Sequence, residues 1–113
     1  MFGQSKGRQL TQLKTILLID DDDDLRDALS EQFVMTEEFN IVEAATGAAA
    51  LQQVKDGLFH LLIIDVGLPD TDGRELCRLM RKQGLRTPVI MLTGHVTDAD
   101  TILGLDAGAN DYV

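Results

Sequence analysis

The stretch ILLIDDDDD, residues 16–24, joins four aliphatic side chains directly to five carboxylates. An aliphatic run of this length, without polar alternation, is typical of a parallel strand that is buried on both faces. Neighbouring carboxylates repel one another, and each is more stable when it is surrounded by water. The stretch therefore predicts a buried strand whose carboxyl end opens onto an acidic crevice.

Similar aliphatic runs recur along the chain and alternate with helical patterns. Further strands are predicted at 39–42, 61–64 and 88–92, and the start of a fifth strand at 110–113. Helices are predicted at 25–36, 47–57, 73–84 and 98–108, with N-caps at Asp22 or Asp23, at Thr46, at Asp72 and near Asp98. Repeated strand–helix units of this kind predict an α/β fold, a doubly wound parallel sheet with helices on both faces.

Apolar spacing also predicts which helical side chains face the core. They are Leu25, Leu29 and Phe33 in the first helix and Leu76, Leu79 and Met80 in the third. Cys77, in the same third helix, is interpreted as a small buried or half-buried hydrophobe rather than a redox group.

Composition limits the classes of function. The chain has 113 residues, enough for one domain, and its 19 acidic and 10 basic residues give a net charge of -9. This charge argues against direct binding to nucleic acid or to membranes. A single cysteine and no apolar run near the ~18 residues that span a bilayer predict a cytoplasmic protein. Residues 1–14 lack the apolar region of a signal peptide, so we expect a flexible N-terminal segment followed by one domain over 15–113.

Three predicted strands end in polar side chains. Asp20 and Asp21 follow the first strand, Asp65 follows the third and Thr93 the fourth. The functional crevice of such sheets lies beyond the carboxyl ends of the strands, so these residues should share one edge. Three carboxylates around one crevice would force at least one to keep its proton unless a cation binds, and Mg²⁺ prefers oxygen ligands. The sequence thus predicts a Mg²⁺-assisted phosphate site in which one aspartate is a candidate nucleophile.

Other interpretations of the acidic residues remain open. Residues 22–24 suit a solvated helix start, where negative charge interacts favourably with the helix dipole. A calcium-binding loop beginning at Asp20 would need glycine where the chain has Leu25. An Mg²⁺-dependent phosphohydrolase with an aspartate nucleophile would use Asp20 and Asp22, but it leaves Asp65 without a role.

Four motifs together carry a family resemblance. ILLIDDD, LLIIDVGLPDTDG, PVIMLTG and AGANDYV, in this order and spacing, resemble the receiver domain of two-component response regulators from about Thr15 to the last residue. The resemblance implies a flavodoxin-like parallel sheet in the order 2-1-3-4-5. It also implies a phosphoacceptor switch rather than an enzyme, which takes a phosphoryl group from a histidine kinase or a phosphotransfer protein.

The resemblance assigns roles to individual residues. Asp65 would accept the phosphoryl group. Asp21, Asp65 and the backbone carbonyl of Gly67 would bind Mg²⁺, with Asp20 acting mainly through water. Thr93 would hydrogen-bond the phosphoryl group, and Tyr112 would be the aromatic side chain that turns inward when Thr93 moves.

The loop after the phosphoacceptor and the one after the fourth strand also carry singled-out residues. The resemblance implies that Pro69 and Gly73 shape the first loop. His95, two residues after Thr93, is close enough to influence the lifetime of the phosphoryl group, and a plain surface role is an equal alternative. The AGANDYV ending resembles receivers fused to a DNA-binding output domain, which would lie outside this chain.

The sequence departs from the family pattern at its end. The family has a Lys-Pro pair shortly after the position of Tyr112, and the chain stops at Val113, so we expect a truncated receiver with an incomplete last strand and no fifth helix. The missing lysine leaves open a pseudo-receiver that binds partners without gaining phosphate. Without the fifth helix, apolar side chains of 16–19 and 61–64 should lose their cover, which predicts a homodimer or an exchange of elements between chains.

Overall fold

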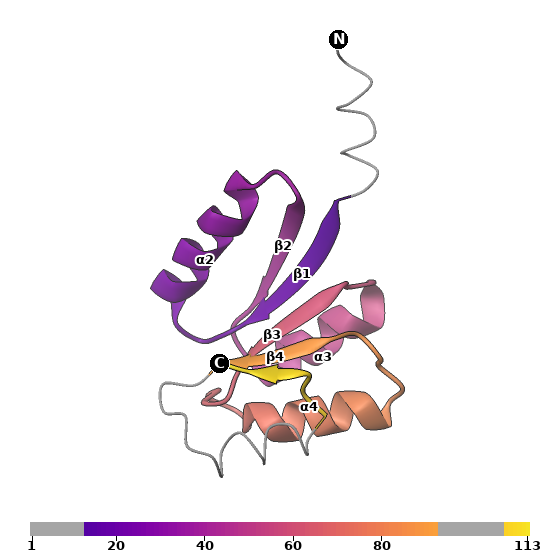
Figure 1. The fold of residues 1–113 in the computed structure, drawn as a ribbon. Helices are drawn as coiled ribbons and strands as arrows, with labels where there is room; N and C mark the ends of the chain where they lie inside the picture. Colours follow the sequence, from indigo (N-terminus) through magenta and orange to yellow (C-terminus); the bar gives the residue numbers. More distant parts are fainter. Residues whose placement is uncertain (1–12, 93–107) are drawn as a thin grey trace.

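The chain forms a parallel sheet with helices on both faces (Figure 1). A computed structural model describes residues 13–92 and 108–113. The elements in chain order are β1 (Lys14–Ile19), α2 (Asp23–Met35), β2 (Phe39–Ala44), α3 (Gly47–Asp56), β3 (Leu61–Asp65), α4 (Gly73–Lys82), β4 (Val89–Leu92) and β5 (Asp111–Tyr112).

The order of the strands in the sheet is β2-β1-β3-β4-β5, and all neighbouring pairs are parallel. The predicted α/β class and strand order are therefore confirmed. The predicted fourth helix, 98–108, lies outside the described residues except for its last position.

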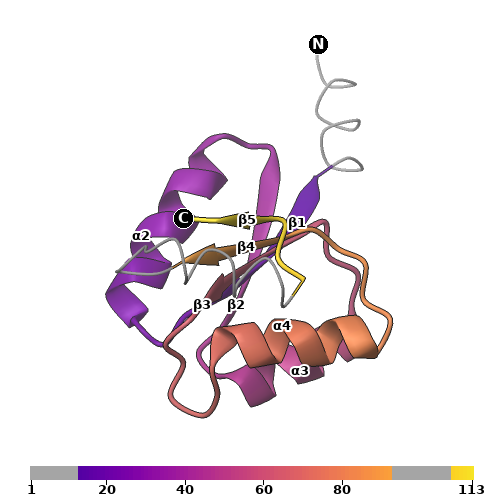
Figure 2. The same ribbon diagram turned by 60° about the horizontal axis from the view of Figure 1, so that its bottom comes forward.

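Two apolar clusters lie on opposite faces of the sheet, because side chains alternate along each strand. Figure 2 shows α2 on one side of the sheet and the pair α3 and α4 on the other. Leu17 and Ile19 of β1 belong to the cluster with α3 and α4, whereas Ile16 and Leu18 belong to the cluster with α2. All four side chains are buried, as predicted for a strand covered on both faces.

The described helices α2, α3 and α4 each begin at a predicted cap. Asp22 accepts a hydrogen bond from the backbone of Leu25 at 3.1 Å, and Thr46 accepts one from the backbone of Ala49 at 3.1 Å. Asp72 does the same for Arg74 at 2.8 Å. These side chains satisfy backbone N–H groups that have no partner within the helix.

Two predicted core positions are wrong. Leu25 is 38% exposed and Leu79 is 41% exposed. Leu25 lies in the first turn of α2 and is not part of the cluster that Leu29 and Phe33 join. Leu79 lines a groove between α3 and α4 instead of the sheet surface. Leu29 and Phe33 lie against the sheet as predicted, although they are only partly buried.

The prediction that the central strands would have an uncovered apolar face is also wrong. Ile16, Leu18 and Ile63 are at most 6% exposed on the face that α2 covers. Leu29 and Phe33 of α2 pack against them together with side chains of the sheet itself. Among the described helices, none has both the length and the apolar character that crossing a membrane requires.

Candidate functional site

Three carboxylates meet at one edge of the sheet. Ile19 of β1 pairs with Ile64 of β3, so the next residues lie side by side: Asp20 directly follows β1, and Asp65 is the last residue of β3. One carboxylate oxygen from each of Asp20, Asp21 and Asp65 lies within 4.8 Å of the others. The strand-end rule thus correctly placed these three side chains together.

The three carboxylates differ in exposure. Asp20 is buried, with 3% of its surface exposed, Asp65 is intermediate and Asp21 is exposed. The cluster therefore joins one buried carboxylate to one exposed carboxylate. Asp65, of intermediate exposure, is accessible to solvent and close to both of the others.

Burial is the main cause of the altered acidity in this cluster. It raises the pKa of Asp20, against a hydrogen bond of 2.9 Å from the backbone N–H of Asp22, and the charge of Asp21 raises it further. Burial also raises the pKa of Asp65, against a hydrogen bond of 3.3 Å from the N–H of Gly67, and the charge of Asp20 raises it further. Without a cation the ionised cluster is thus unfavourable.

The donor set fits a hard divalent cation. All three side-chain donors are oxygens, and Mg²⁺ takes oxygen ligands while it keeps several waters. The exposed side of the cluster leaves space for those waters. A cation here would also neutralise the repulsion that raises the pKa of Asp20 and of Asp65.

The loop after Asp65 is held closed by its own backbone. Gly67 and Asp72 form an isolated bridge, and the N–H of Gly73 donates to the carbonyl of Val66 at 2.8 Å. A Cβ atom at Gly73 would lie 2.2 Å from the carbonyl oxygen of Asp65, so only glycine fits this close approach. These contacts fix the backbone around Gly67, whose N–H donates a hydrogen bond of 3.3 Å to the carboxylate of Asp65.

The remaining aspartates of the opening stretch serve the start of α2. Asp22 caps the helix, and Asp23 forms an ion pair with Arg26. Asp24 is exposed in the first turn. This arrangement confirms the helix-start interpretation of Asp22, and Asp22 and Asp24 are not in the cluster that a calcium loop would need.

Several sequence-predicted residues lie outside the described part of the chain. Thr93 and His95 are among them, although Leu92, the last described residue of β4, pairs with Asp65. The backbone of Tyr112 is described and pairs with Met91, but its side chain is not. Cys77 is buried, and burial raises the pKa of its thiol, as expected of a hydrophobic contact residue.

Sequence reasoning missed two residues near the site. Asp70 accepts hydrogen bonds from the backbone of Gly47 and Ala48, more than twenty residues earlier in the chain. Arg26 donates to the carbonyl of Asp20 and also binds Glu43 of β2. An aspartate after a proline indicates a turn, but no local signal reveals which distant backbone it will contact.

Comparison with known proteins gives matches that cover nearly the whole chain. The sequence model of the response regulator receiver domain family matches residues 16–113. The transcriptional regulatory protein AfsQ1 of Streptomyces coelicolor is 38% identical over 89% of this chain and 44% of its own length. The transcriptional regulatory protein CpxR of Escherichia coli is 41% identical over 89% of this chain and 42% of its own length. The chain thus spans less than half the length of these relatives.

Solved structures give the same result. The receiver domain of the Francisella response regulator 1452 matches with a TM-score of 0.84 at 29% identity, over 88% of this chain and 82% of that one. A putative response regulator from Chloroflexus aurantiacus matches with a TM-score of 0.81 at 39% identity, over 89% of this chain and 84% of that one. With its parallel sheet, its strand-end carboxylates and these matches, the chain belongs to the response regulator receiver domain family.

Proposed function

We propose that this chain is a phosphoacceptor switch of a two-component system, with Asp65 as the residue that takes the phosphoryl group. The observation that carries the proposal is the convergence of Asp20, Asp21 and Asp65 at the carboxyl edge of the sheet. The donor would be the phosphohistidine of a sensor histidine kinase or of a phosphotransfer protein. The switch would be regulatory, acting on itself at most as a slow phosphatase, and it would work in the cytoplasm as one domain over residues 15–113.

The proposed reaction forms one bond and breaks one. A carboxylate oxygen of Asp65 attacks phosphorus, the bond between phosphorus and the imidazole nitrogen breaks, and the imidazole leaves with the electron pair. Asp65 suits this role because it is partly exposed, whereas Asp20 is buried and has little access to a donor.

Asp21, Asp65 and the carbonyl of Gly67 would hold Mg²⁺, with Asp20 acting mainly through water. The ion would supply positive charge that offsets the charge of the incoming phosphoryl oxygens. The buried carboxylate of Asp20 orients the backbone of Asp22 through their hydrogen bond and so fixes the turn that presents Asp21. The N–H of Gly67 orients the carboxylate of Asp65.

The phosphorylated state would be read through Thr93 and Tyr112. A phosphoaspartate adds charge and acceptor oxygens, for which the hydroxyl of Thr93 would be a donor, and the movement of Thr93 would bias the position of Tyr112. AfsQ1 and CpxR are transcriptional regulatory proteins more than twice as long as their match to this chain. We therefore infer that the output is a DNA-binding domain outside this chain, which itself makes no direct contact with nucleic acid.

The decisive experiment is incubation with acetyl phosphate and Mg²⁺, followed by intact mass measurement. The unmodified chain should gain one phosphoryl group, Asp65→Asn should gain none, and Asp24→Asn, a neighbouring exposed carboxylate, should behave like the unmodified chain. No gain in any chain would favour a pseudo-receiver. Release of many phosphates per molecule would favour the phosphohydrolase, especially if Asp20→Asn lost this activity as fully as Asp65→Asn.

A further inference from the structure

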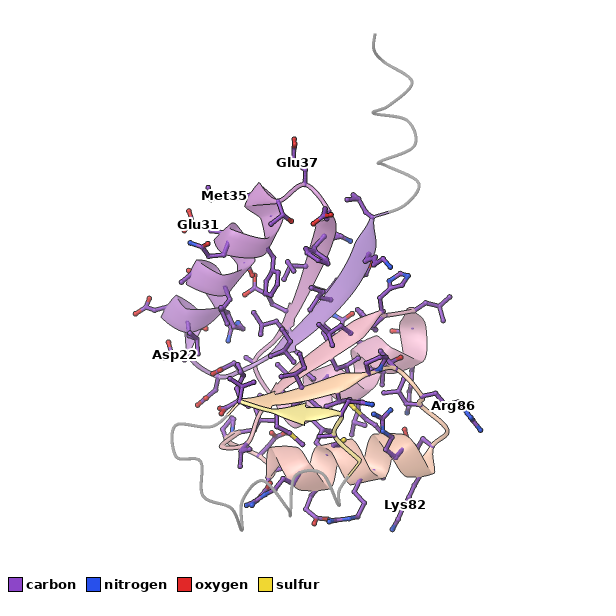
Figure 3. All side chains as sticks on the ribbon, in the orientation of Figure 1. Asp22, Glu31, Met35, Glu37, Lys82 and Arg86 are labelled. Atoms are coloured by element: carbon purple, nitrogen blue, oxygen red, sulfur yellow. The ribbon has the colours of Figure 1, made fainter. Side chains whose placement is uncertain are left out.

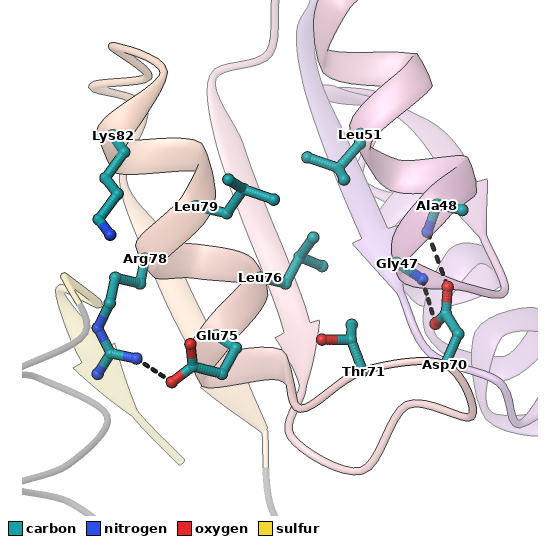
Figure 4. Close-up of a pocket in the computed structure, with 10 residues that line it drawn as sticks. All are labelled: Gly47, Ala48, Leu51, Asp70, Thr71, Glu75, Leu76, Arg78, Leu79 and Lys82. Atoms are coloured by element: carbon teal, nitrogen blue, oxygen red, sulfur yellow. Dashed lines mark hydrogen bonds and ion pairs between the residues drawn. The ribbon is translucent and has the colours of Figure 1, made fainter.

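Asp70 links the loop of the proposed acceptor site to a distant helix. It lies in the loop between β3 and α4, and its two carboxylate oxygens accept hydrogen bonds from the backbone N–H groups of Gly47 at 2.8 Å and Ala48 at 3.0 Å (Figure 4). These groups belong to the first turn of α3, where no partner exists within the helix. The same contacts hold the pKa of Asp70 below its usual range.

The first turn of α3 is satisfied from two different sources. Thr46, the local cap, accepts a hydrogen bond from the next N–H group, that of Ala49, at 3.1 Å. Thr46 and Asp70 therefore stabilise the same helix end by the same kind of interaction. Of these two caps, Asp70 is the one that belongs to the loop, so its hydrogen bonds join the helix end to the loop.

The loop also packs closely against α3 at Gly47. A Cβ atom at Gly47 would lie 2.6 Å from Cγ2 of Thr71 and 3.3 Å from a carboxylate oxygen of Asp70. Gly47 is buried in this contact. The loop and the helix are thus fitted together by shape as well as by hydrogen bonds.

The other end of the loop reaches the acceptor site. Gly67, whose N–H donates to Asp65, is bridged to Asp72, and Gly73 is bonded back to Val66. Only two residues of this closed loop lie between Gly67 and Asp70. A movement at Asp70 would therefore be transmitted to the backbone of Gly67.

We propose that Asp70 is a positioning residue of the acceptor site, which fixes the carbonyl of Gly67 and the carboxylate of Asp65 by clamping their loop to the N-terminus of α3. The inference rests on the proposed function, because it takes the Gly67 carbonyl and Asp65 as ligands of Mg²⁺. Asp70 itself touches neither the cation nor the phosphoryl group.

Mg²⁺ titration of the whole chain tests the clamp, with the backbone amide signal of Gly67 as the readout. Asp70→Ala should weaken Mg²⁺ binding by about tenfold, the lower end of the effect seen when outer-shell partners are removed. Asp70→Asn keeps one acceptor oxygen and should restore part of the affinity. Thr46→Ala is the matched control: it removes a cap from the same helix end with a comparable loss of stability, and its Mg²⁺ affinity should stay that of the unmodified chain.

A metal-free measurement separates the clamp from the proposed function. Hydrogen exchange at the N–H of Gly73, which closes the loop, should be faster in Asp70→Ala than in Thr46→Ala. Equal Mg²⁺ affinity and equal exchange in Asp70→Ala and Thr46→Ala would overturn the clamp while leaving the proposed function in place. An unmodified chain that neither responds to millimolar Mg²⁺ nor takes up a phosphoryl group would instead overturn the proposed function and, with it, the positioning role.

Discussion

At the scale of single residues, the ionised carboxylates of the acidic cluster lower the stability of the folded state in the absence of a cation. Burial and like charges raise the pKa of Asp20 and of Asp65 above the ordinary carboxyl value of 3.8. The folded state therefore holds protons more tightly than the unfolded state in the range just above that value. By linkage, the contribution of these groups to folding stability falls as pH rises through their folded pKa.

We therefore expect Asp65→Asn to melt at a higher temperature than the unmodified chain in metal-free buffer at neutral pH. The gain should shrink as pH falls and vanish below the ordinary carboxyl value, where both states of Asp65 are protonated. Saturating Mg²⁺ should reverse the order, because a ligand that binds only the folded state stabilises it. Thermal melts with and without a chelator measure this, with Asp24→Asn as control, and a lower melting temperature of metal-free Asp65→Asn at neutral pH would contradict it.

Gly73 provides a prediction in which local propensity and packing oppose each other. Alanine is favoured over glycine in a helix by about 1 kcal/mol, so propensity alone makes Gly73→Ala stabilising. A Cβ atom there would overlap the carbonyl oxygen of Asp65 at 2.2 Å, and overpacking of this kind costs about 1–3 kcal/mol. We expect a net loss of stability together with slower phosphoryl uptake.

Denaturant unfolding of Gly73→Ala and Gly57→Ala makes the comparison. A Cβ atom at Gly57 would meet its nearest neighbour at an ordinary 3.7 Å, so Gly57→Ala should change stability little. Equal stability of the two variants would show that the loop can move away from the added methyl group.

At the scale of elements, Arg81 joins α4 to the segments that precede two strands. Its guanidinium donates to the carbonyls of Leu85 and Thr87 before β4, and to Gly108 and the side chain of Asn110 before β5. Asn110 in turn accepts a hydrogen bond of 2.9 Å from the backbone of Val89. These hydrogen bonds therefore connect α4, the segment before β4 and the segment before β5 to one another, in addition to the pairing of β4 with β5 in the sheet.

We expect Arg81→Lys to lower the free energy of unfolding by about 1.5–3 kcal/mol, the usual size for hydrogen bonds to a charged group that are lost. A compact ammonium cannot reproduce the fork of donors that serves all four partners. Lys82→Ala is the control, because Lys82 points away from the fold into solvent (Figure 3). Urea unfolding would contradict the expectation if the two variants were equally stable.

The hydrophobic pattern of the sequence predicted the strands and helices well, but it predicted less well which side chains contact one another between them. The strand at 16–19 and the cap at Thr46 were correct because burial and capping are local signals. The strand order, also correct, was implied by the family resemblance and not by any local pattern. Leu79 was wrong because spacing indicates which side chains share a face, but not whether a neighbouring helix covers that face. The strand-end rule correctly predicted that Asp65 lies beside Asp20 and Asp21. The hydrogen bonds of Asp70 reach a backbone 22 and 23 residues away, which no local pattern identifies.

At the scale of the whole molecule, the expected homodimer or exchanged assembly stays a prediction. The surface that could drive it is smaller than the bare sheet face that the sequence led us to expect. The central strands are covered on the α2 face, so they offer little area for association. Exposed apolar side chains remain on α2 at Val34 and Met35, and at the chain end at Val113. Figure 3 shows Met35 directed outward at the end of α2.

Light scattering coupled to size exclusion measures the oligomeric state. We expect an assembly larger than a monomer at tens of micromolar. Met35→Glu should shift it toward monomer, because it replaces an exposed apolar side chain of α2 with a charged one. Val113→Glu tests the chain end in the same way. A folded monomer of the unmodified chain at that concentration would contradict the prediction.

The tied loop between β3 and α4 also bears on how the family can vary in length. Both ends of the loop are bonded to each other, and its Asp70 is bonded to α3, so one residue more or less would break a bridge, the clamp or both. The turn between α3 and β3 has no such restriction at Leu58, which is 92% exposed. In an alignment of relatives, insertions and deletions should therefore gather around the turn at Leu58 and be absent between Val66 and Gly73.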